Sequence, residues 1–401
     1  NPIKVVLSRL IDDWNGYEWV PLQVTSNPAA IYRDKLRSVH NARAVPDTLI
    51  NDEELAAWHE WCTATSRVCN TVIKDKSVAE TLKLISLTGW ASPVFAPLHT
   101  VVIDQPRLDG PVGFISRRNA ARMSSEIIFS ELPHALRITY VDESSDYEPR
   151  EITVYATGYG DGTVSSLTEA TLFQSATYDG ITIESQAEER AERDLAWMYN
   201  RGTLYHATMD IEFLEHKRGN LVLWETDMFG RQTASARILS IETDMSGLIE
   251  AVVLDDYAEM GSGSGNLYLL ENLYEPTNLY ILGTGGGLAF RLLNKTVLTK
   301  EVDEVVDDFR VVFTAPFAMP TAEGNDLIRE GTLVVTGEFA NLAIPVLVWD
   351  VQPGPDLTAT ITAIDYAEDA IYFPGASEDF DLVIYGSDGV VSGIDFVVLE
   401  D

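Results

Sequence analysis

Cysteine is nearly absent from the sequence, which contains only Cys62 and Cys69. Two cysteines cannot form a disulfide framework, and on their own they cannot complete a zinc site, because structural zinc takes four ligands. Both lie among apolar residues, where cysteine behaves as a small hydrophobic side chain. The sequence therefore predicts two buried free thiols.

Positive charge is also scarce, since 28 Lys and Arg residues stand against 62 Asp and Glu residues and the formal net charge is −34. A surface with this balance repels phosphate backbones and anionic lipids at low salt. The composition therefore argues against stable binding to nucleic acids or membranes. It leaves open whether the acidity has a functional purpose or serves only solubility, for instance in a salty habitat.

Long apolar segments are missing too. No apolar run reaches the ~18 residues of a membrane span, and the chain does not start with a basic segment followed by an apolar one. We therefore expect no membrane span and no signal peptide. The 401 residues exceed one ordinary core and 46% of them are hydrophobic, which predicts two to four globular domains.

Recognisable catalytic motifs are lacking. His59-Glu60 lacks the second histidine of a zinc-protease helix, and Ser264 has no nucleophile-elbow frame. Gly283-Thr284-Gly285-Gly286-Gly287 lacks the Lys-Ser/Thr ending of a phosphate loop, so a loop turn is predicted there. The histidines form no pair with ligand spacing: His40, His59, His99, His134, His206 and His216. We assign no catalytic, cofactor-binding or metal-binding residue and expect no enzyme activity and no cofactor.

Carboxylates are the one plentiful catalytic group, as in Asp255-Asp256, in Glu301 to Asp308 and in Asp365 to Asp369. A glycosidase needs two carboxylates that converge across a sugar, and neighbouring pairs arise by chance among 62 acidic residues. The run from Glu301 to Asp308 lacks the spacing and the glycine of a calcium loop. A solvated face is the favoured interpretation of that run.

Helices are predicted in the first ninety residues. After Asn1-Pro2, apolar residues recur at helical spacing up to a stop at Gly16: Ile3, Val6, Leu7, Leu10, Ile11 and Trp14. A second helix is predicted from Asn51, and the capping box of Ser77 and Glu80 opens a third, which ends at Gly89. Arg67 to Lys74 is predicted to form a strand.

A further helix is predicted within the segment from Ser185 to Glu225. Ser185 and Glu188 have the spacing of a capping box. A stripe of residues follows at helical spacing: Ala187, Ala191, Leu195, Met198 and Tyr199. Leu195 lies in the middle of this stripe, so we predict that it is buried. Gly202 is predicted to stop the helix in the left-handed conformation.

Short alternating segments predict antiparallel β-structure from Trp90 onward. Strands are expected at 94–95, 100–104, 126–129, 135–142, 151–155, 205–213, 221–224, 234–242, 249–254, 267–270, 278–282, 308–314, 331–336, 344–351, 358–364 and 381–385. Gly261-Ser262-Gly263-Ser264-Gly265 is predicted to be a flexible linker. The predicted fold class is α+β, mainly β and multidomain, with a helical N-terminal part followed by antiparallel β-barrel or sandwich-like domains.

Five stretches, in this order, resemble the central tail hub of long-tailed bacteriophages, the host-specificity protein J type of lambda-like phages. They are NPIKVVLSRLIDD, VCNTVIKDKSVAETLKLISLTGWASPVF, ALRITYVDESSDYEPREITVY, AEERAERDLAWMYNRGTLYHATMDIEF with RGNLVLWETDMFGRQTASARILSI, and VWDVQPGPDLTATITAIDYAEDAIY. The resemblance covers roughly residues 1–255 and 346–375. This chain has Gly219-Asn220 where the family usually has Gly-Asp, and residues 261–345 match nothing in it.

The resemblance implies a structural virion protein at the distal end of the phage tail. In such a hub, a homotrimer forms a ring around the tail channel, contacts the distal tail protein and other tail-tip proteins, and carries receptor-binding parts. The family brings no catalytic residues. Its extra N-terminal barrel has no counterpart here, so we expect the chain to be a portion of a longer protein. The acidity would then give a channel wall along which DNA slides during ejection.

The expected domain organisation combines these observations. It comprises a helix-rich α+β hub domain at 1–133, a β hub domain at 134–260 with a central helix at 186–201, an additional β domain or insertion at 261–345, and a C-terminal β segment at 346–401 that returns to the hub. Two other functions stay open. One is a receptor- or carbohydrate-binding tail adhesin, and the other is a polysaccharide-degrading enzyme.

Overall fold

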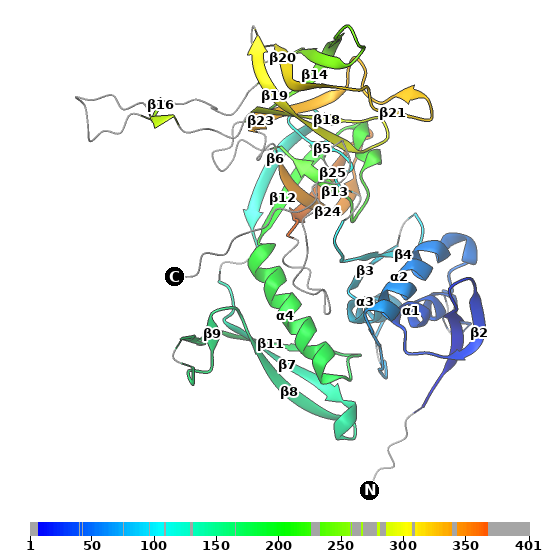
Figure 1. Ribbon diagram of the computed structural model, residues 1–401. Coiled ribbons are helices and arrows are strands. Elements are labelled where there is room, and N and C mark those ends of the chain that lie inside the picture. Colours follow the sequence, from blue (N-terminus) through cyan, green and yellow to red (C-terminus); the bar gives the residue numbers. More distant parts are fainter. Residues whose placement is uncertain are drawn as a thin grey trace. The chain divides into compact units, whose positions relative to one another are not determined.

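The computed structural model describes residues 7–367, apart from gaps at 40, 42, 75, 96, 108–109, 129–130, 165, 226–232, 257, 259–265, 268–278, 281–285, 307–308 and 339–342. All of the described residues belong to one unit, Asn1–Ile371, and its secondary structure is mainly β (Figure 1). In this part of the chain, no helix has both the length and the apolar character that a membrane crossing requires.

The first described element is a β-hairpin, where the sequence pattern predicts a helix. β1 (Leu10–Trp14) pairs with β2 (Trp19–Val24). Asn15-Gly16 makes the turn, with Gly16 at φ +97° and the Asn15 side chain accepting from the Tyr17 and Glu18 amides at 2.9 Å. Of the apolar residues in the pattern that the structure describes, Leu7 and Leu10 are exposed and only Ile11 is buried. The turn chemistry therefore prevails over the apolar spacing.

Three helices follow: α1 (Pro28–Arg37), α2 (Asp52–Ala64) and α3 (Val78–Thr88). The predicted capping box is present, since the side chains of Ser77 and Glu80 each accept from the other's backbone amide. Asn51 caps α2 as expected. Helix α1 is not among the predicted helices, although Asn27 caps it and a proline occupies its first turn.

The core of this helical part forms around Trp58. Its ring is fully buried, and its indole nitrogen donates to the Gly89 carbonyl at 2.9 Å. A Cβ at position 89 would lie 2.7 Å from that ring, so only glycine fits there. The other members of the core come from all three helices, from the segments that connect them, and from the hairpin of β3 (Ala91–Val94) and β4 (Thr100–Ile103): Ala29, Tyr32, Leu36, Ile50, Leu55, Cys62, Cys69, Leu82, Ile85, Ala91 and Val101.

Both cysteines are free and buried, as predicted. Burial raises the pKa of the Cys69 thiol to about 11 and also raises that of Cys62, so neither is a reactive thiolate near neutral pH. Residues 67–74 form no strand, and the prediction there is wrong. Their amides bond singly to separate segments, with Cys69 donating to the Ser26 carbonyl and Asn70 to the Gly180 carbonyl, so no ladder develops.

Helix α4 (Glu184–Asn200) packs on a three-stranded sheet in the order β11-β7-β8. β7 (Ala135–Asp142) pairs antiparallel with β8 (Glu148–Tyr155) and parallel with β11 (Phe173–Thr177). Leu195 is buried, as predicted, and packs with Leu136, Ile138, Ala156 and Ala191. The helix starts earlier than predicted, with Ile183 at the N-cap and no capping bond from Ser185. Arg201 is the C-cap, and Gly202 is not left-handed.

A six-stranded sheet gathers distant segments in the order β5-β13-β24-β25-β12-β6. Its strands are β5 (Phe114–Ile115), β6 (Ala120–Ile127), β12 (Thr203–Met209), β13 (Leu221–Trp224), β24 (Ile344–Pro353) and β25 (Ala359–Asp365). The predicted strands at 205–213 and 221–224 are therefore not neighbours, because β24 and β25 separate them. The first ends at Met209, and the 3-10 helix η3 (Ile211–Glu215) follows it.

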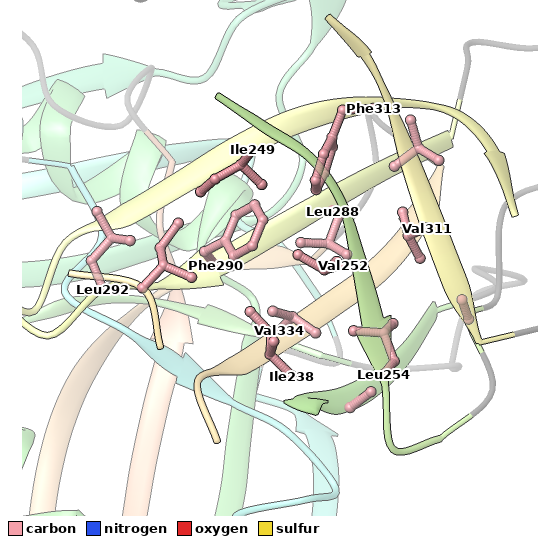
Figure 2. Packing of buried hydrophobic residues seen from close by; sticks show 14 of the residues in the cluster. Ile238, Ile249, Val252, Leu254, Leu288, Phe290, Leu292, Val311, Phe313 and Val334 are labelled. Carbon is pink, nitrogen blue, oxygen red and sulfur yellow. The ribbon is translucent and has the colours of Figure 1, made fainter. Parts of the chain in front are cut away.

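After β13 the chain leaves this sheet and forms a closed antiparallel barrel, and at β24 it returns to the sheet. Its order is β14-β15-β20-β19-β18-β23, with strands Thr233–Thr243, Ile249–Leu254, Arg310–Phe317, Val297–Val306, Gly286–Arg291 and Leu333–Glu338. Phe290, Phe313 and Leu288 fill its interior (Figure 2). β14 and β15 fall in the predicted 134–260 domain, yet they close one barrel with strands from the predicted 261–345 domain.

The remaining described elements are short. They are η1 (Asp47–Leu49), η2 (Glu143–Ser145), β9 (Tyr159–Gly160), β10 (Thr168–Glu169), β16 (Asn266–Leu267), β17 (Leu279–Tyr280), β21 (Thr321–Ala322) and β22 (Asn325–Asp326). The predicted linker at 261–265 and the predicted strand at 381–385 lie outside the described residues.

Truncating Leu195 tests the packing of α4 on its sheet. We expect Leu195→Ala to lower the free energy of unfolding by about 2–5 kcal/mol, because it leaves a cavity in a buried cluster. Leu214→Ala is the matched control, since Leu214 is 64% exposed and its loss should change stability by less than about 0.5 kcal/mol. Thermal or urea unfolding measures both. Equal effects of the two substitutions would contradict the packing described here.

Candidate structural site between the barrel and the six-stranded sheet

An apolar cluster joins the barrel to the six-stranded sheet. Phe114 of β5 is fully buried against Ala289 of β18 and against Leu333 and Val335 of β23, and Leu223 of β13 packs beside them. The barrel therefore uses both surfaces of its wall, because β18 and β23 also send Phe290 and Val334 into its interior. We call this cluster and the polar residues around it the junction.

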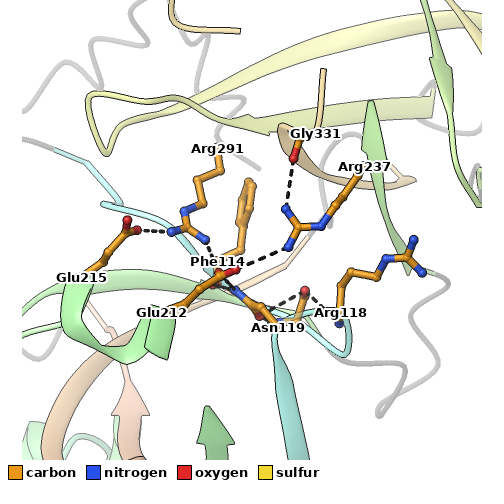
Figure 3. Close-up of polar contacts among 9 residues, drawn as sticks. Phe114, Arg118, Asn119, Glu212, Glu215, Arg237, Arg291 and Gly331 are labelled. Carbon is orange, nitrogen blue, oxygen red and sulfur yellow. Dashed lines mark hydrogen bonds and ion pairs between the residues drawn. The ribbon is translucent and has the colours of Figure 1, made fainter. Parts of the chain in front are cut away.

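Glu212 is the polar centre of the junction (Figure 3). It projects from η3, directly after β12, toward two barrel strands. Its carboxylate accepts from Arg291 of β18 at 2.8 Å and from Arg237 of β14 at 3.4 Å. Asn119, in the turn between β5 and β6, donates to the same carboxylate at 3.3 Å. One side chain of the sheet module thus holds two strands of the barrel.

Further ion pairs surround this centre. Arg291 also pairs with Glu215, and Arg118 pairs with both Asp255 and Asp256. The Arg237 amide donates to the Asp255 carboxylate at 2.7 Å, which ties the end of β15 to β14. An apolar centre with a charged rim is the arrangement of a stable protein interface, and here it lies within one chain.

The electrostatics keep this centre charged. Partial burial by itself raises the pKa of Glu212, but the hydrogen bond and charge of Arg291, with Asn119 and Arg237, outweigh it and the pKa is lowered. Glu212 therefore stays ionised well below neutral pH. Removing one partner of such a group would leave the other charge partly buried and uncompensated.

His216 is the neutral member of the junction. Its ring is buried, and neither ring nitrogen has a hydrogen-bond partner among the described residues. Burial and the nearby positive charge of Arg291 lower its pKa to about 4. The imidazole is therefore uncharged at neutral pH, and protonating it would place a cation beside Arg291.

The carboxylates that the sequence singles out have separate roles. Asp255 and Asp256 pair with Arg118 at the rim of the junction. Glu301, Asp303 and Glu304 are exposed on β19, in agreement with a solvated face, while 307–308 lie outside the described residues. Asp365 accepts from the Thr203 amide at 3.1 Å and from the Tyr205 hydroxyl at 2.7 Å, which fixes β25 beside β12.

The histidines are also dispersed. His59 bonds to Asp13 at 2.8 Å, His134 stacks on Tyr159, and His206 lies 3.2 Å from the Thr362 hydroxyl. His99 bridges by its backbone to residues 49–51, and His40 lies outside the described residues. Across the described part of the chain, no three His, Cys, Asp or Glu side chains gather closely enough to hold a metal ion.

The end of the glycine run is a strand and not the predicted turn. Gly286 and Gly287 are the first residues of β18, opposite Val302 and Glu301, whereas 281–285, like Ser264, lie outside the described residues. The junction itself escapes sequence reasoning, because Glu212 and Arg291 are 79 positions apart. One weak indication is available: Arg291 interrupts the apolar run from Leu288 to Leu293, as an internal ion pair would require.

The neutral state of His216 predicts acid sensitivity at the junction. A histidine whose pKa falls from 6.5 to about 4 on folding stabilises the fold above pH 6.5 and loses that contribution as the pH falls toward 4. Between pH 7 and pH 5 we expect a loss of about 2 kcal/mol from this group. In His216→Leu that part of the loss should disappear from urea unfolding curves, whereas it should remain in the control His206→Gln. An unchanged pH profile in His216→Leu would contradict the assignment.

Comparisons with known proteins return distant structural matches. No family model and no curated protein matches the chain. Among solved structures, the chain is similar to a chain of the virion of the native gene transfer agent particle, with a TM-score of 0.31 and 14% identity over 50% of this chain and 46% of that one. It is also similar to a tail protein from Neisseria meningitidis MC58, with a TM-score of 0.30 and 14% identity over 43% of this chain and 57% of that one. The chain thus spans about half the length of the solved chains that it matches.

Proposed function

We propose that this chain is a structural component of a bacteriophage tail, the central hub of the tail tip. Three copies would form a ring around the tail channel at the distal end of the virion, joined to the distal tail protein above and to receptor-binding parts below. The proposed role is mechanical and not enzymatic. It follows the resemblance of the sequence to the protein J type of hub.

One observation carries the proposal. The stretches that resemble the hub family include 187–213 and 218–241, which nearly adjoin, and 348–372, which begins 107 positions after residue 241. Their strands β12, β13, β24 and β25 are nevertheless consecutive in one sheet, in the order β13-β24-β25-β12. Stretches that matched by chance would have no reason to pair with one another. Their pairing supports the interpretation that they derive from one hub module.

The junction supports a mechanical role. Two chain crossings, an apolar cluster around Phe114 and the bonds of Glu212 all fix the barrel against the sheet. Several simultaneous constraints make a hinge between the two modules costly. A ring that transmits force from a tail tip to a tail tube needs such stiffness. The geometry is therefore better suited to a wall than to a lid over an active site.

The acidity is consistent with a channel through which DNA passes without binding. In a trimer whose chains each carry −34, acidic faces in contact would repel one another, so we expect the seams to be apolar and neutral. The excess of carboxylates would then lie on the lumen or on the outer rim. A lumen of that sign would leave duplex DNA free to slide.

Assembly as a function of salt tests the proposal. We expect sedimentation velocity to detect a trimer that strengthens with added salt, because screening shortens the repulsion between chains to about 8 Å at physiological ionic strength. Particle images should contain threefold rings. In the same preparation, duplex DNA should not bind even at low salt, where a basic control protein binds most tightly.

Two outcomes would count against the hub. If the protein is a monomer at every salt concentration and at high protein concentration, the proposed ring is contradicted. If DNA is retained in a low-salt gel shift, the proposed non-binding channel surface is contradicted. A monomer that is retained by host envelope fractions would favour the tail adhesin instead, and release of reducing sugars from those fractions would favour the enzyme.

A further inference from the structure

A cavity of about 250 Å³ lies where the helical part, α4 and the six-stranded sheet meet. Its walls come from α3, the β3–β4 hairpin, the α4 helix, the turn before β13, and strands β24 and β25. Apolar lining is supplied by three indole rings, those of Trp90, Trp197 and Trp349, and by Leu347, Val348 and Ile364. The hub role proposed above makes no use of this cavity.

The charge of the lining is opposite to that of the protein. Five arginines line the cavity, namely Arg107, Arg190, Arg193, Arg201 and Arg218, whereas the acidic residues among its described lining are Asp104 and Asp194. Arg190 pairs with Asp194, but Arg193 and Arg201 share the single carboxylate of Asp104 in a chain whose formal net charge is −34. A buried excess of positive charge is costly without a counter-ion.

The buried end of the cavity is built around Asp104. Arg201 donates to both of its carboxylate oxygens at 3.1 Å, and Arg193 pairs with it as well. Burial by itself raises the pKa of Asp104, but the two guanidinium charges outweigh it and the pKa is lowered. One carboxylate thus serves two guanidinium groups, each of which carries a full positive charge.

Some of the N–H donors of Arg193 and Arg201 make no hydrogen bond to the described residues. The Arg201 side chain is 1% exposed, and its Nε and Nη2 have no hydrogen-bond partner among the described residues. The same holds for Nε of Arg193, whose side chain is 9% exposed. Buried donors are normally satisfied, so these donors beside the cavity are available to an acceptor that enters it.

The opposite wall positions Arg218. Its Nη1 donates to the Pro93 carbonyl at 2.9 Å, and its guanidinium lies 5.2 Å from the centroid of the Trp349 ring. The next residue, Gly219, has φ +87°, and a Cβ there would meet Val102 at 2.5 Å. The turn is therefore pressed against β4 in a conformation that only glycine adopts without strain. Burial also lowers the pKa of Arg218, although the charge of Asp350 acts in the opposite direction.

We propose that this cavity binds the phosphate or carboxylate group of a small anion. A guanidinium fork matches these planar or tetrahedral oxyanions through paired hydrogen bonds, and Arg193, Arg201 and Arg218 line the same space. The indole rings provide apolar surface for the remainder of the ligand. The volume is below the range of drug-sized ligands, ~300–1,000 Å³, so the anion is small. It is either a free metabolite-sized anion or an acidic side chain of a partner protein.

Calorimetric titration with inorganic phosphate and with citrate, at constant ionic strength maintained with chloride, tests the site in the full chain. We expect saturable binding and a melting temperature that rises with ligand concentration. Arg218→Gln should weaken binding roughly tenfold, because it removes a charge-assisted hydrogen bond. Arg310→Gln is the matched control, since Arg310 pairs with Glu242 on the barrel, and it should leave the affinity unchanged.

Arg218→Lys keeps the charge and replaces the guanidinium fork with a single ammonium group, so it decides the matter if the glutamine variant does not fold. It too should bind more weakly. A tetraglutamate peptide that binds more tightly than phosphate or citrate assigns the acceptor to a partner chain, and the reverse order assigns it to a free anion. Absence of saturable binding of all three probes, or equal weakening by the Arg218 and Arg310 variants, would overturn the proposal. None of these outcomes depends on whether the chain forms a trimer.

Discussion

Buried guanidinium groups hold the seams between the described parts of this chain. Arg33 of α1 is 5% exposed and joins Asp12 of the first hairpin to Asp52 of α2. Arg67, after α2, reaches Glu189 on α4 at 2.6 Å. At the junction, Arg291 takes its carboxylates from η3. Because arginine stays charged and offers five donors in a rigid fork, one side chain can fix two elements at once.

This use of arginine explains how so acidic a chain keeps a buried polar framework. The 28 basic residues are too few to neutralise the acidic surface. Several of them are largely buried, and each of these pairs with carboxylates from another element. The uncompensated carboxylates remain outside, as on β19. A pair of this kind adds little net stability compared with apolar packing, yet losing one partner is severe. The pairs therefore specify how the parts dock more than they stabilise each part.

Local patterns predict much of the fold, and long-range pairing escapes them. The capping box at Ser77, the burial of Leu195 in α4 and the strands at 135–142 and 151–155 all depend on residues close in sequence, and each is confirmed. The first helix fails for a related reason, since the Asn15-Gly16 turn and the pairing of Trp14 with Trp19 decide the conformation. Helix α1 is not predicted because a charged residue, Arg33, interrupts the apolar pattern of its buried face. Arg33 can be buried there because it pairs with Asp12 and Asp52, which are distant in the sequence. Which strands form the barrel depends on pairings such as that of Thr233 with Gly337. These residues are too far apart in the sequence for a local pattern to reveal the pairing.

The arginine-lined cavity differs from the other seams in one respect. Arg33 meets two carboxylates, and at the junction Arg291 and Arg237 meet Glu212 and Glu215, so charge there is balanced within the chain. Around Asp104 the same construction is left incomplete, because Arg193 and Arg201 share this one carboxylate. An acceptor from outside the chain accounts for the imbalance, and its arrival would tie α4, the β3–β4 hairpin and the turn at Gly219 together as the internal pairs do elsewhere.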